Sequence, residues 1–130
     1  MSSSFRNRLA SGKALIGTWA KTPSMINAEV LGRTPLDCVC LDAEHAPFDR
    51  ASIDAAILAL KAQNMPALVR IPSLASEHVL SALDCGSTGI VAQPDIAIGP
   101  AFEFYRRTDQ FPRTCVVGGV SHKQANLLSA

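Results

Sequence analysis

The chain has 130 residues, a formal net charge of +1, 48% hydrophobic residues and 18% charged residues. This length allows one domain with one core, and the composition excludes a disordered chain. The small net charge gives no global basic field for nucleic acid or acidic membranes, so we expect neither as a partner. No apolar run approaches the roughly 18 residues of a membrane span.

The cysteines and the amino end bear on cellular location. No C-x-x-C pair occurs among the four cysteines, which are Cys38, Cys40, Cys85 and Cys115. We expect reduced, mostly buried thiols in a cytoplasmic protein, because a domain of this size needs no disulfide. The first 28 residues hold four basic and no acidic residues, as a transit peptide would. A short helix over residues 4–11, ended by Gly12, is the better interpretation because a strand follows at once.

Short apolar runs alternate with segments of helical spacing along the chain. The predicted strands are residues 15–20, 36–41, 67–71 and 90–92. Four strand–helix units in this order predict an α/β fold with a parallel sheet and right-handed crossovers. Residues 115–117 fit either a fifth strand or a loop.

The helices between these strands are predicted from caps and from apolar stripes. The first of them should begin at Thr22-Pro23, with the hydroxyl as its cap, and a later one at Ser73 or Ser76. A further helix is expected over residues 100–108. The expected buried positions are Ile26, Val30 and Leu31, then Ile53, Ala56, Ile57 and Leu60, and then Val79, Leu80 and Leu83.

The segment L-D-A-E-H-A-P, residues 41–47, places polar side chains at the end of the second predicted strand. Ligands in parallel α/β folds bind outside the carboxyl ends of strands, so Asp42, Glu44 and His45 are candidate site residues. The alternative is a solvated loop with Asp49 as a helix cap. A neutral His45 can serve as a general base or a metal ligand, or it can simply bond a backbone carbonyl.

Two further charged residues need a partner. Arg70 interrupts an apolar strand near its carboxyl end, where it can clamp a substrate carboxylate or form a salt bridge with Asp42 or Glu44. Asp84 lies near a helix carboxyl end, where the macrodipole disfavours an acid, so it calls for a cationic partner. Because that end faces away from the strand carboxyl ends, Asp84 would serve a histidine such as His45 only across a subunit interface; otherwise it is an exposed acid.

Six blocks of sequence in a fixed order carry a resemblance to a known family. They are F-R-N-R-L-A-S-G-K (5–13), L-I-G-T-W (15–19), A-E-V-L (28–31), D-C-V-C-L-D-A-E-H-A-P (37–47), V-R-I-P (69–72) and L-D-C-G-S-T-G-I-V (83–91). Over residues 5 to about 92, the chain resembles the HpcH/HpaI aldolase/citrate lyase family. Its 4-hydroxy-2-oxoheptanedioate and 2-dehydro-3-deoxyglucarate aldolases look most similar.

The resemblance implies a (β/α)8 barrel that assembles as a homo-oligomer and reversibly cleaves a 2-oxo acid to pyruvate and an aldehyde. A divalent metal (Mg²⁺, Mn²⁺ or Co²⁺) would chelate the 2-oxo acid and stabilise its enolate. By position, His45 resembles the family's base, Arg70 the residue that holds the oxo-acid end, and Asp84 the carboxylate paired with the histidine. Asp42 and Glu44 would have supporting roles in the same block.

The chain also departs from the family. A (β/α)8 barrel needs about 250 residues, and the family's metal-binding Glu (in a Q-I-E-type strand) and Asp (in a G-P-x-D-type loop) have no counterpart, since Asp95 follows the fourth strand. We therefore expect the N-terminal half of a barrel over residues 1–113, an irregular tail over 114–130, and little or no activity for a truncated copy.

Two alternatives stay open. One is a non-catalytic binding or assembly module that pairs with itself or with a full-length aldolase, because a half barrel leaves strand edges unpaired. The other is a small flavodoxin-like domain, for which the strand order would be 2-1-3-4 instead of sequential.

Overall fold

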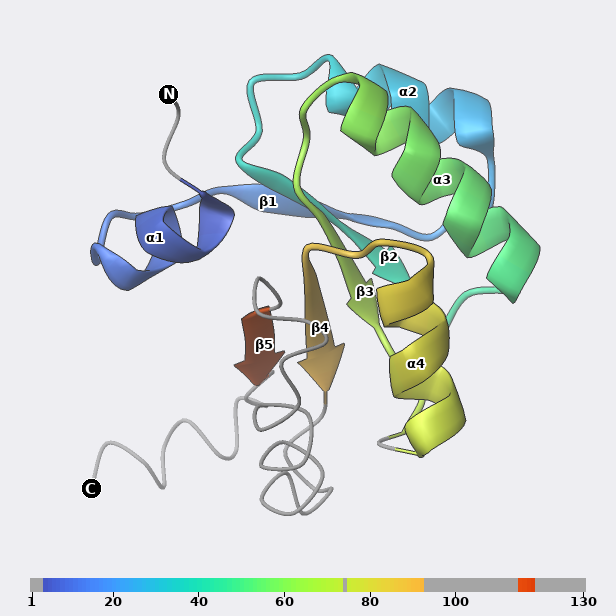
Figure 1. Ribbon diagram of the computed structural model, residues 1–130. Helices are drawn as coiled ribbons and strands as arrows, with labels where there is room; N and C mark the ends of the chain where they lie inside the picture. Colours follow the sequence, from blue (N-terminus) through green and yellow to red (C-terminus); the bar gives the residue numbers. More distant parts are fainter. Residues whose placement is uncertain (1–3, 74, 93–114, 119–130) are drawn as a thin grey trace.

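The computed structural model describes residues 4–73, 75–92 and 115–118, the last of these as backbone only. Helices and strands alternate along it (Figure 1). The elements are α1 (Phe5–Ala10), β1 (Gly17–Ala20), α2 (Met25–Gly32), β2 (Cys38–Asp42), α3 (Arg50–Ala62), β3 (Ala67–Arg70), α4 (Ser76–Asp84), β4 (Gly89–Ala92) and β5 (Cys115–Gly118).

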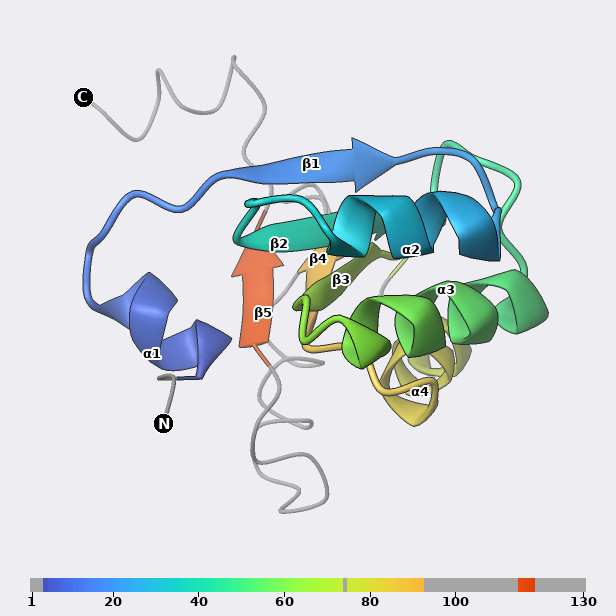
Figure 2. The ribbon, with the colours of Figure 1, turned by 90° about the horizontal axis from the view of Figure 1, so that it is seen from above.

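The strands form one parallel sheet in the order β1-β2-β3-β4-β5. Helices α2, α3 and α4 lie on one side of this sheet, and α1 lies on the other side, near the start of β1 (Figures 1 and 2). The sequential order confirms the predicted arrangement of the N-terminal half of a (β/α)8 barrel and excludes the 2-1-3-4 order of the flavodoxin-like alternative. Residues 115–118 form a fifth strand that pairs with β4, which is one of the two options left open by the sequence. These four residues therefore depart from the irregular tail expected over residues 114–130.

Side-chain caps set where most of the helices begin. Ser4 caps α1, and the Asp49 carboxylate accepts the N–H of Ser52 at 2.8 Å in a capping box at α3. The prediction that α2 begins at Thr22-Pro23 is wrong, because the Ser24 hydroxyl caps α2 by accepting the N–H of Asn27 at 3.2 Å.

Helix α4 also departs from its predicted start. Its N-cap position is Ala75, which has no side-chain acceptor, and Ser76 is already the first helical residue. The Ser73 hydroxyl instead accepts the N–H of Ala75 at 3.3 Å, so it orders the turn before the helix.

The apolar stripe predicted for α2 is wrong for two of its three residues. Ile26 is 71% exposed and Val30 is 59% exposed, whereas Ala28 and Gly32 are buried and Leu31 is partly buried against the core. Small residues let α2 approach α3 closely: a Cβ atom added to Gly32 would lie 3.0 Å from the Gln63 side chain. The helix therefore buries its smallest residues and leaves its larger ones outside.

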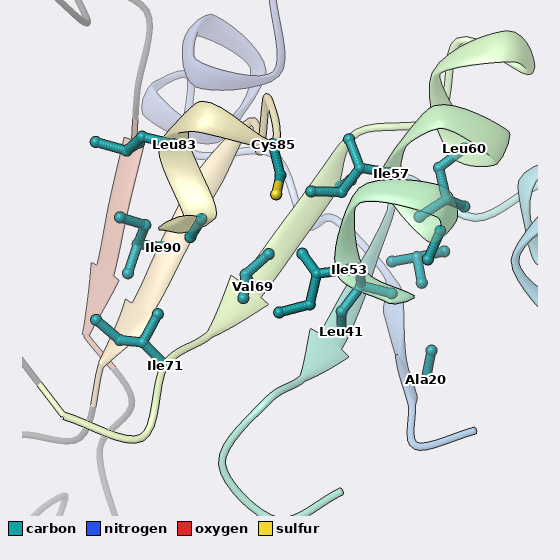
Figure 3. Close-up of a cluster of buried hydrophobic side chains, with 14 of the residues drawn as sticks. Ala20, Leu41, Ile53, Ile57, Leu60, Val69, Ile71, Leu83, Cys85 and Ile90 are labelled. Carbon is teal, nitrogen blue, oxygen red and sulfur yellow. The ribbon is translucent and has the colours of Figure 1, made fainter. Parts of the chain in front are cut away.

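The main core lies between the sheet and the helices α3 and α4 (Figure 3). The predicted inner face of α3 is confirmed, since all four of its residues are buried. In α4, Val79 and Leu83 are buried as predicted, but Leu80 is 41% exposed, so its assignment to the inner face was wrong. Buried strand residues complete this core, among them Val39, Leu41, Val69 and Ile90.

A second, smaller cluster lies on the other face of the sheet. Phe5 of α1 packs there against Cys40, Leu68 and Val91. The thiols of Cys38, Cys40 and Cys85 are free, as predicted, and burial raises the pKa of Cys40 to about 12.

Two sequence-based expectations concern residues that lie wholly or partly outside the described ranges. The helix predicted over residues 100–108 lies outside the described residues, and the domain boundary at residue 113 stays a prediction. Within the described ranges, no helix combines the length and the apolar character needed to cross a lipid bilayer.

The buried face of β2 makes the core testable. Leu41 is 0% exposed, so Leu41→Ala should lower the free energy of unfolding by about 2–5 kcal/mol through lost burial and a residual cavity. The matched control is Leu58→Ala on α3, where the side chain is 66% exposed and a change within about 0.5 kcal/mol is expected. Urea unfolding measures both variants, and equal losses would contradict this core.

Candidate active site

The candidate site lies at the carboxyl ends of β1, β2 and β3, on the face of the sheet opposite α2–α4. Val39 and Leu41 pack under the helices, so strand alternation turns Asp42 to the other face. Asp42 is the last residue of β2, and its register partner is Arg70, the last residue of β3. The pairing of adjacent parallel strands therefore brings this acid and this base side by side.

Asp42 and Arg70 form a bidentate ion pair. Arg70 Nε donates to Asp42 Oδ1 at 3.0 Å, and Nη2 donates to Oδ2 at 2.6 Å. The Asp42 side chain is 0% exposed and that of Arg70 is 17% exposed. Of the two roles that the sequence left open for Arg70, the salt bridge with Asp42 is the one observed.

The same carboxylate also shapes the turn that follows β2. The backbone N–H groups of Glu44 and His45 donate to Asp42 Oδ1 at 3.2 and 3.0 Å. A side chain that accepts from the backbone two and three residues onward fixes the conformation of the turn. Asp42 thus positions the two polar residues that come after it.

Hydrogen bonds decide the charge state of Asp42. Burial by itself would raise the pKa of this carboxyl, but the Arg70 side chain and the N–H groups of His45 and Glu44 outweigh burial and lower the pKa to about 2. Hydrogen bonding to Asp42 raises the pKa of Arg70. Both groups are therefore fully charged near neutral pH.

Glu44 links His45 to Arg70. One carboxylate oxygen, Oε1, lies 3.2 Å from His45 Nε2, and the other, Oε2, lies 3.7 Å from Arg70 Nε. Oε2 is buried and accepts no hydrogen bond, whereas the His45 side chain is 56% exposed. The predicted site residues His45 and Arg70 therefore face one shared carboxylate.

Two residues that the sequence analysis missed complete the cluster. The ring of Trp19 on β1 lies over the guanidinium of Arg70, with 4.2 Å between its centroid and Cζ. Lys21, just after β1, places Nζ 3.7 Å from Asp42 Oδ2. Applying the rule of strand carboxyl ends to the first strand as well as to the second and third would have identified both.

Asp84 lies apart from this cluster within the chain. It ends α4 and pairs with Arg50 of α3 at 3.6 Å, which supplies the cationic partner that the helix dipole calls for. With Arg50, Ala51, Asp54 and Cys85 it lines a hollow of about 420 Å³. Its pairing with a histidine across a subunit interface stays a prediction.

The described residues do not supply a complete site for a divalent metal. Within them, no group of three or more His, Cys, Asp or Glu side chains converges on one point. The Asp42 oxygens already accept from Arg70 and the turn, and Glu44 Oε2 is a buried acceptor of this cluster with no hydrogen-bond donor. A metal of the kind that the resemblance implies would need ligands from elsewhere.

Because the pKa of Asp42 is low, the free energy of unfolding should depend on pH in the acid range. Because its folded pKa of about 2 lies below the unfolded value of about 3.9, Asp42 contributes about 2–3 kcal/mol above pH 4, and this is lost as the pH falls towards 2. Urea unfolding between pH 2 and 6 should show a shallower acid loss for Asp42→Asn than for the native chain.

The same variant removes the bidentate partner of the guanidinium and leaves only Glu44 at 3.7 Å, so at pH 7 it should lose about 3 kcal/mol. The matched control is Asp84→Asn at the half-exposed pair with Arg50, for which we expect less than about 1 kcal/mol at any pH. Identical acid profiles for the native chain and Asp42→Asn would show that Asp42 is not held ionised by this network.

Comparison with known proteins gives homologues that are named aldolases. The chain is 28% identical over 111 residues to hydroxypyruvate/pyruvate aldolase of Roseobacter denitrificans, covering 85% of the chain and 41% of that protein. It is 35% identical over 82 residues to 5-keto-4-deoxy-D-glucarate aldolase of Klebsiella pneumoniae, covering 63% of the chain and 32% of that protein. No protein-family model matches the chain.

The fold is shared with a solved structure from Burkholderia cenocepacia, described as an HpcH/HpaI aldolase/citrate lyase family protein. That structure superposes with a TM-score of 0.72 at 23% identity, covering 95% of this chain and 61% of the other. The chain spans less than half the length of the two aldolases above. The predicted resemblance is confirmed: the chain is a homologue of named aldolases and shares the N-terminal part of the fold of the HpcH/HpaI aldolase/citrate lyase family.

Proposed function

We propose that this chain is a carbon–carbon lyase that binds a small 2-oxo acid at the Asp42–Arg70 pair and takes part in reversible aldol cleavage to pyruvate and an aldehyde. The observation that carries the proposal is the shared Glu44 carboxylate, which faces His45 on one side and Arg70 on the other. The names of the homologues, aldolases of hydroxypyruvate, pyruvate and a keto-deoxy sugar acid, support the same reaction class.

Arg70 would hold the oxo-acid end of the ligand with the donors that Asp42 leaves free. A guanidinium has five N–H donors, and two of those on Arg70 point to Asp42. Asp42 and the Trp19 ring fix the plane of the guanidinium, so its remaining N–H groups have a set direction. A fixed donor of this kind stabilises the negative charge that develops on the oxo oxygen as the carbon–carbon bond breaks.

His45 would move the proton. In the cleavage direction, a base takes the proton of the hydroxyl on C4, the C3–C4 bond breaks, the aldehyde leaves, and the electron pair stays behind as the enolate of pyruvate, which then accepts a proton at C3. The exposed ring of His45 is accessible to a ligand, and Glu44 Oε1, 3.2 Å from Nε2, orients the ring.

The first test follows binding and proton transfer separately. Trp19 is the single tryptophan and lies over Arg70, so pyruvate binding should change its fluorescence. The chain should also accelerate deuterium exchange at the methyl group of pyruvate, which proton NMR in D2O measures. His45→Gln should retain binding but lower that exchange roughly 100-fold, because the proton acceptor is lost.

The matched control is His78→Gln on α4, which should catalyse the deuterium exchange of pyruvate at the rate of the native chain. Unchanged exchange in His45→Gln would remove His45 from the reaction. We expect aldol cleavage by this chain alone to be weak, because the described residues lack a metal-binding set. Robust pyruvate release in the presence of Mn²⁺ would contradict this weak activity.

A second candidate function, assembly with another copy of the chain or with a full-length aldolase, has an observation of its own. Met25, Ile26 and Val30 on α2 are 55%, 71% and 59% exposed, and β1 pairs only with β2 in the described sheet. Exposed apolar side chains beside an open strand edge favour self-association. This surface is compatible with a homo-oligomeric aldolase as well as with a non-catalytic module.

Sedimentation velocity tests the assembly. The native chain should form a dimer or larger species at micromolar concentration, and Ile26→Glu should shift it towards monomer. Leu58→Glu on α3, at a residue that is 66% exposed, is the control for added charge and should leave the distribution unchanged. A native chain that stays monomeric at every concentration would rule out self-assembly.

A further inference from the structure

Lys21 lies at the same end of the sheet as the Asp42–Arg70 pair but donates no hydrogen bond to that pair. It follows β1 directly, and its side chain is 62% exposed while its Nζ lies 3.7 Å from Asp42 Oδ2. By strand alternation it shares a face with Trp19, whose ring covers Arg70. Its ammonium group is thus directed to the candidate site and remains open to solvent.

Lys21 does not donate a hydrogen bond to Asp42. Asp42 Oδ1 accepts from Arg70 Nε and from the N–H groups of Glu44 and His45, and Oδ2 accepts from Arg70 Nη2. At 3.7 Å, Nζ lies beyond hydrogen-bond distance from Oδ2. The three donors of the ammonium therefore stay available for another anion.

Arg70 is less free to serve as the main anion receptor. Its Nε–Nη2 edge, which would form a fork with a ligand carboxylate, is taken by Asp42, and Glu44 lies 3.7 Å from Nε. The positive charge of Arg70 is thus balanced within the cluster. Lys21 is therefore a cationic side chain at this end of the sheet whose hydrogen-bond donors are available to a ligand.

We propose that Lys21 binds the carboxylate of the 2-oxo acid, while Arg70 meets its oxo end. Arg70 Nη2 and Lys21 Nζ approach the same atom, Asp42 Oδ2, at 2.6 and 3.7 Å, so a ligand as short as a 2-oxo acid can contact both. This assignment rests on the proposed function and adds the residue that selects a charged ligand over a neutral one.

The experiment compares pyruvate with pyruvamide, a neutral ligand of almost the same shape, by titrating the purified chain and following Trp19 fluorescence. Lys21→Met should weaken pyruvate binding roughly fivefold, because a charge-assisted hydrogen bond at an exposed site is lost. Pyruvamide binding should not change. Lys21→Arg should keep most of the affinity for pyruvate, since it retains the charge.

Two controls separate binding from folding and from net charge. Lys13→Met removes another exposed lysine, in the segment before β1, and should bind both ligands like the native chain. Lys21→Gln gives a second neutral variant at this position. The melting temperatures of Lys21→Met and Lys21→Gln, measured by circular dichroism, should equal that of the native chain. Loss of affinity for pyruvate and pyruvamide alike would show a structural role and overturn the assignment.

The remaining outcomes separate this inference from the proposed function. If the native chain binds pyruvate and Lys21→Met binds it equally well, the assignment of Lys21 fails and the proposed 2-oxo-acid site stands. If the native chain binds neither ligand, both the proposed site and the role of Lys21 are overturned.

Discussion

The buried ion pair between Asp42 and Arg70 is the interaction on which the candidate site depends. A carboxylate with no solvent exposure is tolerable only when its charge is matched and its oxygens are hydrogen-bonded, and Arg70 and the following turn meet both conditions. Because the two residues are register partners on adjacent strands, the pair aligns the ends of β2 and β3. Hydrogen bonds to Asp42 fix the conformation of the following turn, and this turn places Glu44 and His45 near Arg70.

Such a pair is a costly way to stabilise a sheet. Well-packed apolar residues often match or exceed the stability that a buried ion pair gives, and the neighbouring positions Leu41 and Val69 show that this sheet uses them. The benefit of the pair lies instead in orientation, since it fixes the guanidinium plane and leaves three of its donors uncommitted. A salt bridge and a ligand-binding role, which the sequence presents as alternatives for Arg70, are thus compatible.

The resemblance to a barrel family predicted the sequential strand order, and the spacing of apolar residues over several turns predicted the inner face of α3. The spacing failed on α2, where packing distance and not hydrophobicity decides the buried face: Ala28 and Gly32 fit against α3, and Ile26 and Val30 do not. At the site, the strand ends identified Asp42, Glu44, His45 and Arg70 as neighbours. Their contacts were out of reach, because they depend on a turn whose shape is set by side-chain hydrogen bonds.

Strand alternation separates stability from chemistry in this sheet. On β2, Val39 and Leu41 face the helices and build the core, whereas Cys40 and Asp42 face the other side. On that side, Phe5 belongs to a small apolar cluster, and the carboxyl ends of β2 and β3 hold the charged pair. Changes at Lys21 or His45, whose side chains are 62% and 56% exposed, should therefore alter ligand binding or proton transfer with little effect on folding. Changes at Asp42 must affect both, because its carboxylate is buried and hydrogen-bonded to Arg70 and to the turn that carries His45.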